Sequence, residues 1–279
     1  MLIKNEQPIL FSIDLEDHTE RYDNTSRYIN NTEKYLVFLE QNQLKATFFT
    51  VGLVAKHAPK LVQKISDAGH EIACHSYAHV PLSKQSPEQF KVQTLLAKTI
   101  LEQVSGKKIC GFRAPIFSLT KQTNWAANIL QELDFEYSSS VLPNANPLYG
   151  YPRLPQTPFI WSSGLIELPV VVGGIGKFRV PFLGGFYLRY LPNFVIRKFL
   201  NEMPKEAVAW TYLHPYDIDY EEVNWKINNA AHWVSLLLWL NRKNTLIKIE
   251  RLKRHLLSAT FSQKVLELRN ANLPIIGNI

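Results

Sequence analysis

The sequence predicts an α/β fold built around a parallel sheet. Short apolar runs that are typical of strands alternate with amphipathic helical patterns through the first half of the chain. Acidic and histidine side chains follow several of the predicted strands directly. The 279 residues are 46% hydrophobic, which is enough to fill a sizeable core. This alternation fits either a doubly wound sheet or a sheet closed into a barrel.

The predicted strands are short runs rich in β-branched and aromatic residues. The first, residues 8–14, is a buried apolar run that ends in the acidic residue Asp14. Further strands are expected at residues 46–51, 71–74, 108–112, 135–139 and 207–212. Because a helical pattern lies between each consecutive pair up to residue 139, the strands are expected to run parallel.

The predicted helices carry apolar residues at helical spacing. They are expected at residues 26–41, 59–68, 86–104, 124–133 and 193–202. The third has a clear start, because Ser86-Pro87-Glu88-Gln89 supplies an N-cap, a proline in the first turn and a capping-box partner. Residues 142–185 are rich in proline, glycine and aromatic residues and are expected to form loops and edge strands. With a helical extension from about residue 224, the whole chain, 1–279, is expected to form one domain.

The charge balance is moderately basic. Lysine and arginine outnumber aspartate and glutamate by 31 to 24, which gives a net charge of +7 and a pI of about 9.2. Such a balance favours anionic partners. The basic residues are interleaved with apolar ones rather than grouped in long runs, so no nucleic-acid partner is expected.

The sequence favours a cytoplasmic location. Cys74 and Cys110 are too few for a disulfide framework, which fits a reducing compartment. The first residues lack the pattern of a signal peptide, and no apolar stretch predicts a membrane-spanning helix. Residues 178–200 mix aromatic side chains such as Phe182 with cations such as Arg189. Peripheral contact with the inner face of a membrane is therefore a further hypothesis.

Three groups of polar side chains follow predicted strands. His75-Ser-Tyr-Ala-His79 places two imidazoles four residues apart, and both would reach one metal ion if the segment turns helically. Three carboxylates occur in Asp14-Leu-Glu-Asp17, and His214 follows the strand expected at 207–212. Because parallel strands place their carboxyl ends at one rim, the three groups are expected to converge. A carboxylate with two histidines forms an open three-ligand metal site.

These motifs resemble those of the polysaccharide deacetylase family that shares the NodB homology domain. His75-Ser-Tyr-Ala-His79 matches the family's His-Ser/Thr-x-x-His motif, and the segment from Asp14 to Asp17 matches its acidic pair. Arg113-Ala-Pro115 matches the Arg-x-Pro motif, and Leu213-x-His corresponds to Tyr212-Leu213-His214-Pro215. The resemblance implies a distorted (β/α) barrel, often of seven strands, and the metal-dependent deacetylation of carbohydrates.

The resemblance also implies roles for individual residues. The expected ligands are Asp17, His75 and His79, and zinc is the divalent ion that this set favours. The alternative ligand is Glu16, because side chains alternate along a strand. If the first strand continued through Glu16, that residue would face the histidines and Asp17 would cap a turn.

The catalytic roles fall to the remaining motif residues. Asp14 is expected to act as the base, with Glu16 as a nearby helper. His214 is expected to protonate the departing amine or to stabilise the oxyanion. Arg113 is expected to orient the base through a bidentate ion pair. Where related subgroup members have Tyr-Asp-Ser-Ser, this chain has a serine at position 138, so a contact to Arg113 is expected to be lost.

The expected substrate is an acetylated sugar or glycan, free or linked to a nucleotide or lipid. The sequence around Asp14 and His214 resembles that of a subgroup associated with bacterial exopolysaccharide and surface-glycan synthesis. Two alternatives stay open. One is a hydrolase of another C–N amide bond, such as a cyclic amide, and the other is a non-catalytic glycan-binding relative.

Overall fold

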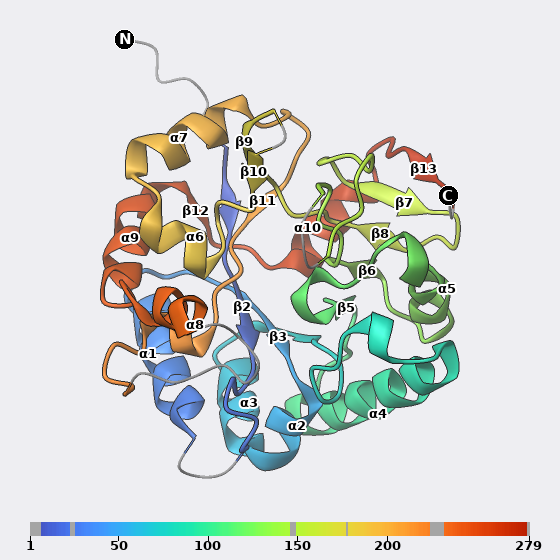
Figure 1. Ribbon diagram of the computed structural model, residues 1–279. Helices are drawn as coiled ribbons and strands as arrows, with labels where there is room; N and C mark the ends of the chain where they lie inside the picture. The colour runs from blue at the N-terminus through green and yellow to red at the C-terminus, as the bar shows by residue number, and fades with distance from the viewer. Residues whose placement is uncertain (1–6, 23–25, 146–148, 177, 224–231, 278–279) are drawn as a thin grey trace.

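The computed structural model describes residues 7–22, 26–145, 149–176, 178–223 and 232–277. Within these residues no helix is long and apolar enough to cross a membrane. Figure 1 shows helices arranged around the outside of a strongly twisted sheet, with α1 and α9 on one flank and α4 and α5 on the other.

The main sheet confirms the predicted α/β class with parallel strands. Its strands run in the order β13-β7-β8-β6-β5-β4-β3-β2, and only β7 and β8 pair antiparallel. In sequence order they are β2 (Ser12–Leu15), β3 (Thr47–Thr50), β4 (Glu71–Cys74), β5 (Gly111–Phe112), β6 (Tyr137–Ser138), β7 (Phe159–Trp161), β8 (Ile166–Glu167) and β13 (Ile275–Ile276). β1 (Ile9–Leu10) precedes β2 and pairs in parallel with β11 (Ala209–Trp210) and β12 (Leu256–Leu257).

The helices follow the predicted alternation. They are α1 (Arg27–Gln41), α2 (Gly52–His57), α3 (Pro59–Asp67), α4 (Pro87–Ser105), α5 (Trp125–Glu132), α6 (Gly185–Tyr190), α7 (Asn193–Glu202), α8 (His232–Trp239), α9 (Asn244–Leu252) and α10 (Phe261–Leu268). The capping box at the start of α4 is present as predicted. The helical extension was expected from residue 224, and residues 224–231 lie outside the described part of the chain.

The sheet curls around a buried arginine. The guanidinium of Arg113, which follows β5, lies 3.7 Å from the ring centroid of Phe49 in β3 and 4.3 Å from that of Trp210 in β11. It also donates to Ser12 in β2 at 3.1 Å. Side chains from three strands and from the residue after β5 therefore meet in the interior. The outer strand at the far end of the sheet is β13, and no strand pairing joins it to β11 within the described residues, so the described strands do not close into a barrel.

Residues 142–185 add short strands rather than a further strand and helix. β7 and β8 lie in this stretch, as does the hairpin of β9 (Gly173–Ile175) and β10 (Phe178–Val180). β8 lies beside β6 in the main sheet, and Gly184 forms a bridge with Tyr212. This segment thus contributes both to the sheet and to the rim near β11.

Candidate active site

A pocket of about 220 Å³ opens where β2, β4 and β11 end. It contains every acid and imidazole of the sequence motifs except Asp17, together with aromatic and apolar side chains. The residues that line it are Asp14, Glu16, His75, His79, Ala114, Ile116, Phe117, Leu142, Tyr149, Pro181, Tyr187, Tyr212, His214 and Tyr216. The predicted convergence at the carboxyl ends of the strands is confirmed.

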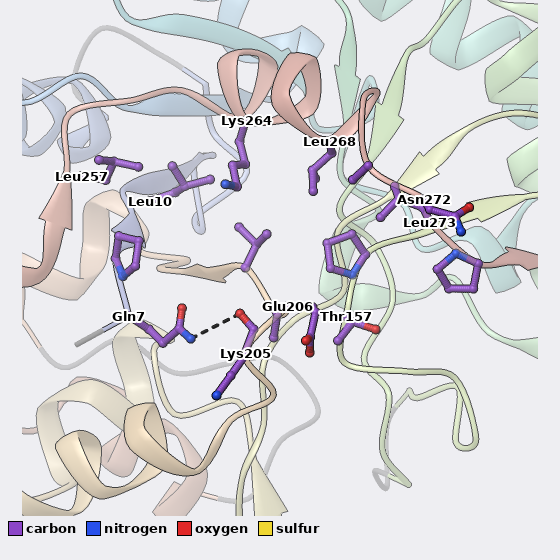
Figure 2. A pocket seen from close by; sticks show the side chains of 16 residues that line it. Gln7, Leu10, Thr157, Lys205, Glu206, Leu257, Lys264, Leu268, Asn272 and Leu273 are labelled. Atoms are coloured by element: carbon purple, nitrogen blue, oxygen red, sulfur yellow. Dashed lines mark hydrogen bonds between the residues drawn. The ribbon is translucent and has the colours of Figure 1, made fainter. Parts of the chain in front are cut away.

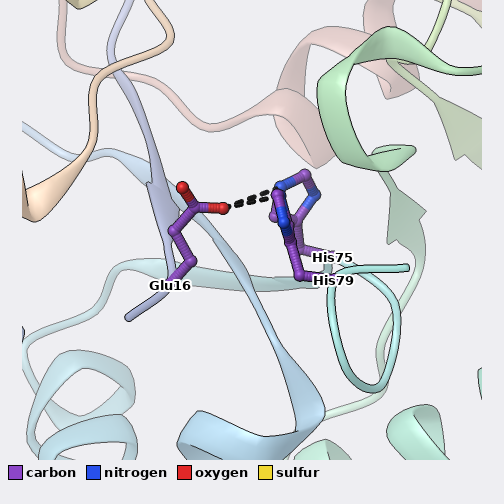
Figure 3. A group of neighbouring side chains, drawn as sticks. All are labelled: Glu16, His75 and His79. Carbon is purple, nitrogen blue, oxygen red and sulfur yellow. Dashed lines mark ion pairs between the residues drawn. The ribbon is translucent and has the colours of Figure 1, made fainter. Parts of the chain in front are cut away.

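Glu16, His75 and His79 form a compact group that fits a metal ion (Figure 3). The Oε2 atom of Glu16 lies 2.6 Å from Nε2 of His79 and 3.8 Å from Nε2 of His75. That oxygen is buried and accepts no well-formed hydrogen bond from the described residues. One carboxylate oxygen and two imidazole nitrogens, all within 4.8 Å of one another, match the donor set of an open zinc site.

Local structure fixes which nitrogen of His75 faces this group. Its Nδ1 lies 2.8 Å from the carbonyl oxygen of Arg113 and donates to it, so Nε2 points to Glu16 with its lone pair free. Burial lowers the pKa of His75 to about 4, so the ring is neutral. Burial opposes a charge on His79, but the adjacent carboxylate of Glu16 raises its pKa above the ordinary value.

The segment from His75 to His79 is a loop, so the helical turn on which the argument from spacing was conditional is absent. Ser76 and His79 both have left-handed backbones, with φ of 65° and 55°. The first amides of α2 hold the loop, because Gly52 N donates to the carbonyl oxygen of Ser76 at 3.0 Å and Leu53 N to that of Tyr77 at 2.9 Å. Both imidazoles still reach the same point.

The structure brings Glu16, and not Asp17, to the histidines. The carboxylate of Asp17 accepts hydrogen bonds from Thr19 N, Thr19 Oγ1, Tyr22 N and Ser26 Oγ at 2.7 to 3.0 Å, so it caps a turn. β2 continues to Leu15, which is fully buried, so Glu16 lies on the same side as Asp14. The preferred placement of Asp17 in the site is thus corrected in favour of the alternative.

Arg113 holds Asp14 through one nitrogen, and the expected bidentate pair was wrong. Nη1 of Arg113 donates to Oδ1 of Asp14 at 2.5 Å. Its Nε and Nη2 both donate to Oγ of Ser139, at 3.1 and 2.9 Å. Burial of this guanidinium lowers its pKa, and the charge of Asp14 acts in the opposite direction.

The residue at position 138 does not face Arg113, so that expectation was also wrong. The hydroxyl of Ser138 donates to Oγ of Ser140 at 2.8 Å and interacts with the buried carboxylate of Glu167. Ser139, which follows β6, is the residue that faces the interior and accepts from Arg113. A carboxylate at 138 would lie beside Glu167 instead of Arg113.

His214 closes the other side of the pocket. Its Nδ1 lies 2.9 Å from Oδ2 of Asp217, whose Oδ1 accepts from Nη1 of Arg189 at 2.5 Å. Its Nε2 lies 3.9 Å from Oδ2 of Asp14. Burial lowers the pKa of His214, but the hydrogen bond and charge of Asp217, with Glu16 and Asp14 beyond, raise it to about 9. The ring of Tyr216 stacks on the imidazole, with centroids 4.6 Å apart and an interplanar angle of 11°.

Two residues of this network were not predicted. Asp217 had a signal in the sequence, because an acid three residues after His214 can reach back to it across a turn. Arg189 had none, since it belongs to α6 and was interpreted as a surface cation. In the structure Arg189 is buried and donates to the carbonyl oxygens of Leu238 and Leu240 as well as to Asp217.

A larger pocket, of about 430 Å³, lies at the opposite end, where β1 and β11 begin (Figure 2). Its polar wall includes Gln7, Lys205, Glu206 and Lys264, and Gln7 Nε2 donates to the carbonyl oxygen of Lys205 at 3.3 Å. Its lining contains no histidine or cysteine and a single carboxylate. The chemistry-bearing side chains are therefore at the carboxyl ends of the strands.

Comparison with known families divides the chain into two adjoining matches. Residues 21–137 match the family described as polysaccharide deacetylase, and residues 139–266 match a domain of unknown function, DUF3473. The first match includes His75, His79 and Arg113, and the second includes His214.

Individual relatives agree with the first match. The chain is 34% identical over 96 residues to a peptidoglycan-N-acetylglucosamine deacetylase of Bacillus cereus, over 34% of this chain and 35% of that protein. It is 24% identical over 216 residues to a peptidoglycan deacetylase of Helicobacter pylori, over 75% of this chain and 66% of the relative. The chain thus spans about a third of the Bacillus enzyme.

The fold agrees with solved structures over nearly the whole chain. A crystal structure from Mycobacterium smegmatis that is assigned to the polysaccharide deacetylases superposes with a TM-score of 0.63. The alignment covers 98% of this chain and 95% of that one at 20% identity. Strands from both matched segments thus share one known α/β fold.

Proposed function

We propose, from the polysaccharide deacetylase domain formed by residues 21–137, that this protein is a metal-dependent hydrolase that removes acetyl groups from a sugar or polysaccharide. The observation that carries the proposal is the pairing of two groups in one pocket. Three potential metal ligands, Glu16, His75 and His79, lie in the same pocket as two groups for proton transfer. These are Asp14 as the base and His214 as the acid.

The trio would hold the ion. Its orphaned buried oxygen on Glu16 and its neutral imidazole on His75 suit a divalent metal, and zinc suits this mixture of ligands best. When bound, such an ion supplies Lewis acidity to an acetyl carbonyl. Asp17 would act indirectly, by fixing the turn that follows Glu16.

Asp14 would act as the base. Arg113 occupies Oδ1 of its carboxylate, so Oδ2 is the oxygen that is free to take a proton from water. The guanidinium is fixed in turn by Ser139 and by the ring of Phe49. This arrangement holds the base in one orientation, with Oδ2 turned toward Nε2 of His214, 3.9 Å away.

His214 would act as the acid. Its raised pKa keeps the imidazole protonated at neutral pH, and the bond from Nδ1 to Asp217 turns Nε2 into the pocket. Water adds to the acetyl carbonyl carbon and gives its proton to Asp14. The C–N bond then breaks, and the amine leaves with a proton from His214, so the products are acetate and a free amino sugar.

The pocket suits a sugar ring. Tyr149, Tyr187 and Phe117 line it and would stack on a pyranose face. Trp161, Phe159 and Tyr151 of the same proline-rich stretch are buried in the core, whereas Tyr149 reaches the pocket. The proposed substrate is an N-acetylated glycan unit, linked to a nucleotide or lipid. The protein would act in the cytoplasm, at the inner face of the membrane, in surface-glycan or exopolysaccharide synthesis.

Mass spectrometry of candidate substrates tests this function. Zinc-loaded protein is incubated with N-acetyl and O-acetyl sugars, with nucleotide-linked and lipid-linked forms, and with cyclic amides. The expected result is loss of one acetyl group from an N-acetyl sugar, absent in the matched variant Asp14→Asn. Hydrolysis of a cyclic amide alone would assign a different C–N hydrolase. Binding of the glycan without any product would assign a non-catalytic relative.

A further inference from the structure

Six exposed residues on the β9–β10 hairpin and α7 form what we term the basic apolar patch. Its members are Ile175, Phe178, Arg179, Phe194, Arg197 and Lys198. The apolar members are unusually open to solvent, with exposures of 79% for Ile175, 90% for Phe178 and 69% for Phe194. Exposed apolar side chains that group on adjoining elements, unlike those scattered singly, mark an interaction surface.

The two elements of the patch are packed together. The ring of Phe199 in α7 lies against the backbone of Gly173 in β9, where a side chain would clash with it. Figure 1 shows the hairpin beside α7 at one end of the molecule. On α7, residues 194, 197 and 198 share a face, while Ile196 and Leu200 are buried on the other. The exposed face is therefore presented by a rigidly docked helix.

The patch adjoins the rim of the active-site pocket. Only two residues separate Phe178 from Pro181, which lines the pocket. The side-chain amide of Asn144 donates to the carbonyl oxygen of Arg179 at 2.8 Å, which ties the hairpin to the stretch that begins with the pocket residue Leu142. A surface that docked on the patch would lie next to the pocket.

We propose that the basic apolar patch binds an anionic lipid surface. Aromatic and aliphatic side chains there would enter the headgroup region while Arg179, Arg197 and Lys198 meet anionic headgroups. Lys198 pairs with the exposed carboxylate of Glu202, 3.8 Å from its Nζ, so three cations in the patch face one acid among the ion pairs of the described residues. The sequence pointed to residues 178–200 for such contact. Within that range Phe182 and Arg189 are buried, whereas Arg179, Phe194, Arg197 and Lys198 are exposed.

Membrane binding can be measured apart from deacetylation, since none of the six side chains lines the pocket. The full-length protein is sedimented with vesicles of phosphatidylcholine containing phosphatidylglycerol, and with vesicles of phosphatidylcholine alone. We expect binding to the anionic vesicles that falls by about fivefold for each cation replaced in Arg197→Gln and Lys198→Gln. The double variant Phe178→Ser with Phe194→Ser should lose at least tenfold.

A matched double variant controls for the loss of exposed apolar surface. Val92 and Leu95, which are 65% and 49% exposed, lie on α4 on another flank of the molecule. Val92→Ser with Leu95→Ser should bind vesicles as the parent protein does. Equal binding by the patch variant and the parent would overturn the proposal. Concentration-dependent dimerisation that the patch variant abolishes, without any vesicle binding, would likewise overturn it and assign the patch to a second copy of the chain.

Discussion

At the scale of single residues, the site depends on which acid follows β2 on the inner face. Asp14 and Glu16 share that face, whereas Asp17 turns back to accept hydrogen bonds from its own loop. The sequence showed three carboxylates in four residues but not where the strand ends. Side-chain alternation left either Glu16 or Asp17 as the metal ligand. The burial of Leu15 and the hydrogen bonds that Asp17 accepts in its own loop decide for Glu16.

Substitution of these acids should separate a ligand from a turn cap. Glu16→Gln should weaken zinc binding by about 100-fold or more, because a neutral amide replaces the charged ligand. Asp17→Asn should keep zinc affinity within a few-fold while lowering the free energy of unfolding by about 1–3 kcal/mol. Isothermal titration with zinc and urea unfolding measure the two effects. Loss of zinc in Asp17→Asn with retention in Glu16→Gln would reverse the assignment.

The pair of His214 and Asp217 predicts a pH dependence. His214 donates its proton only when charged, so turnover should fall as the pH rises through its pKa of about 9. Asp217→Asn removes the charge that raises this pKa, so the alkaline limb of kcat/KM should move down by roughly 1–3 pH units. Steady-state kinetics between pH 6 and 10 with the optimal acetylated substrate measure the shift.

The pair of His214 and Asp217 should also make the free energy of unfolding depend on pH in a definite direction. Because the pKa of His214 is raised from 6.5 to about 9 on folding, its stabilisation is fully present below the unfolded value and is lost as the pH rises through the folded one. The gap in unfolding free energy between the parent and Asp217→Asn should therefore shrink from pH 6 to pH 10. A gap that is constant with pH would mean that Asp217 acts on Arg189 and not on the imidazole.

At the scale of elements, hydrophobic periodicity predicted most helices and strands up to α5, and α7 and β11 beyond it. The short helices α2 and α6 were missed, because six residues are too few to show a helical period. The error at position 138 has a different cause. Alignment with the family motif suggested that the residue at position 138 contacts Arg113. Which serine faces Arg113 depends on the orientation of side chains at β6, and a strand of two residues is too short for that orientation to be inferred from the sequence.

The junction of α2 with the histidine loop makes a prediction at this scale. A Cβ added at Gly52 would lie 2.8 Å from Cδ2 of Tyr77 and 3.2 Å from both its Cα and the Cβ of Ala97. Gly52→Ala should therefore displace the loop that carries both histidines, lowering the unfolding free energy by about 1–3 kcal/mol and weakening zinc binding. Thermal unfolding and zinc titration measure these effects.

Gly106 offers the matched control for that substitution. It ends α4 in a left-handed conformation, and an added Cβ there meets no atom within 4 Å. Gly106→Asn, which tolerates that conformation, should change stability little and leave zinc affinity intact. If both variants bound zinc as the parent does, close packing at Gly52 would have no part in positioning the histidines.

At the scale of the whole molecule, the site is assembled across the boundary between the two family matches. Asp14, His75 and Arg113 lie on the amino-terminal side, while Ser139 and His214 come from residues 139–266. The sequence predicted the convergence because parallel strands end at one rim. It could not predict the link from Arg189 to His214, since α6 is brought to that rim only by the packing of the whole chain.

This division predicts that residues 1–138 do not fold alone. β1 would lose both of its neighbours, β11 and β12, and the guanidinium of Arg113 would lose Ser139 and the ring of Trp210. An uncovered buried cation and an unpaired core strand would lower the free energy of unfolding by more than the net stability of a small domain. The fragment should show no cooperative thermal transition and no zinc binding. Co-expression with residues 139–279 should restore both, because the missing strands and Ser139 return. A cooperative transition in the isolated fragment, with zinc affinity like that of the full chain, would mean that the metal site is complete before the second segment is added.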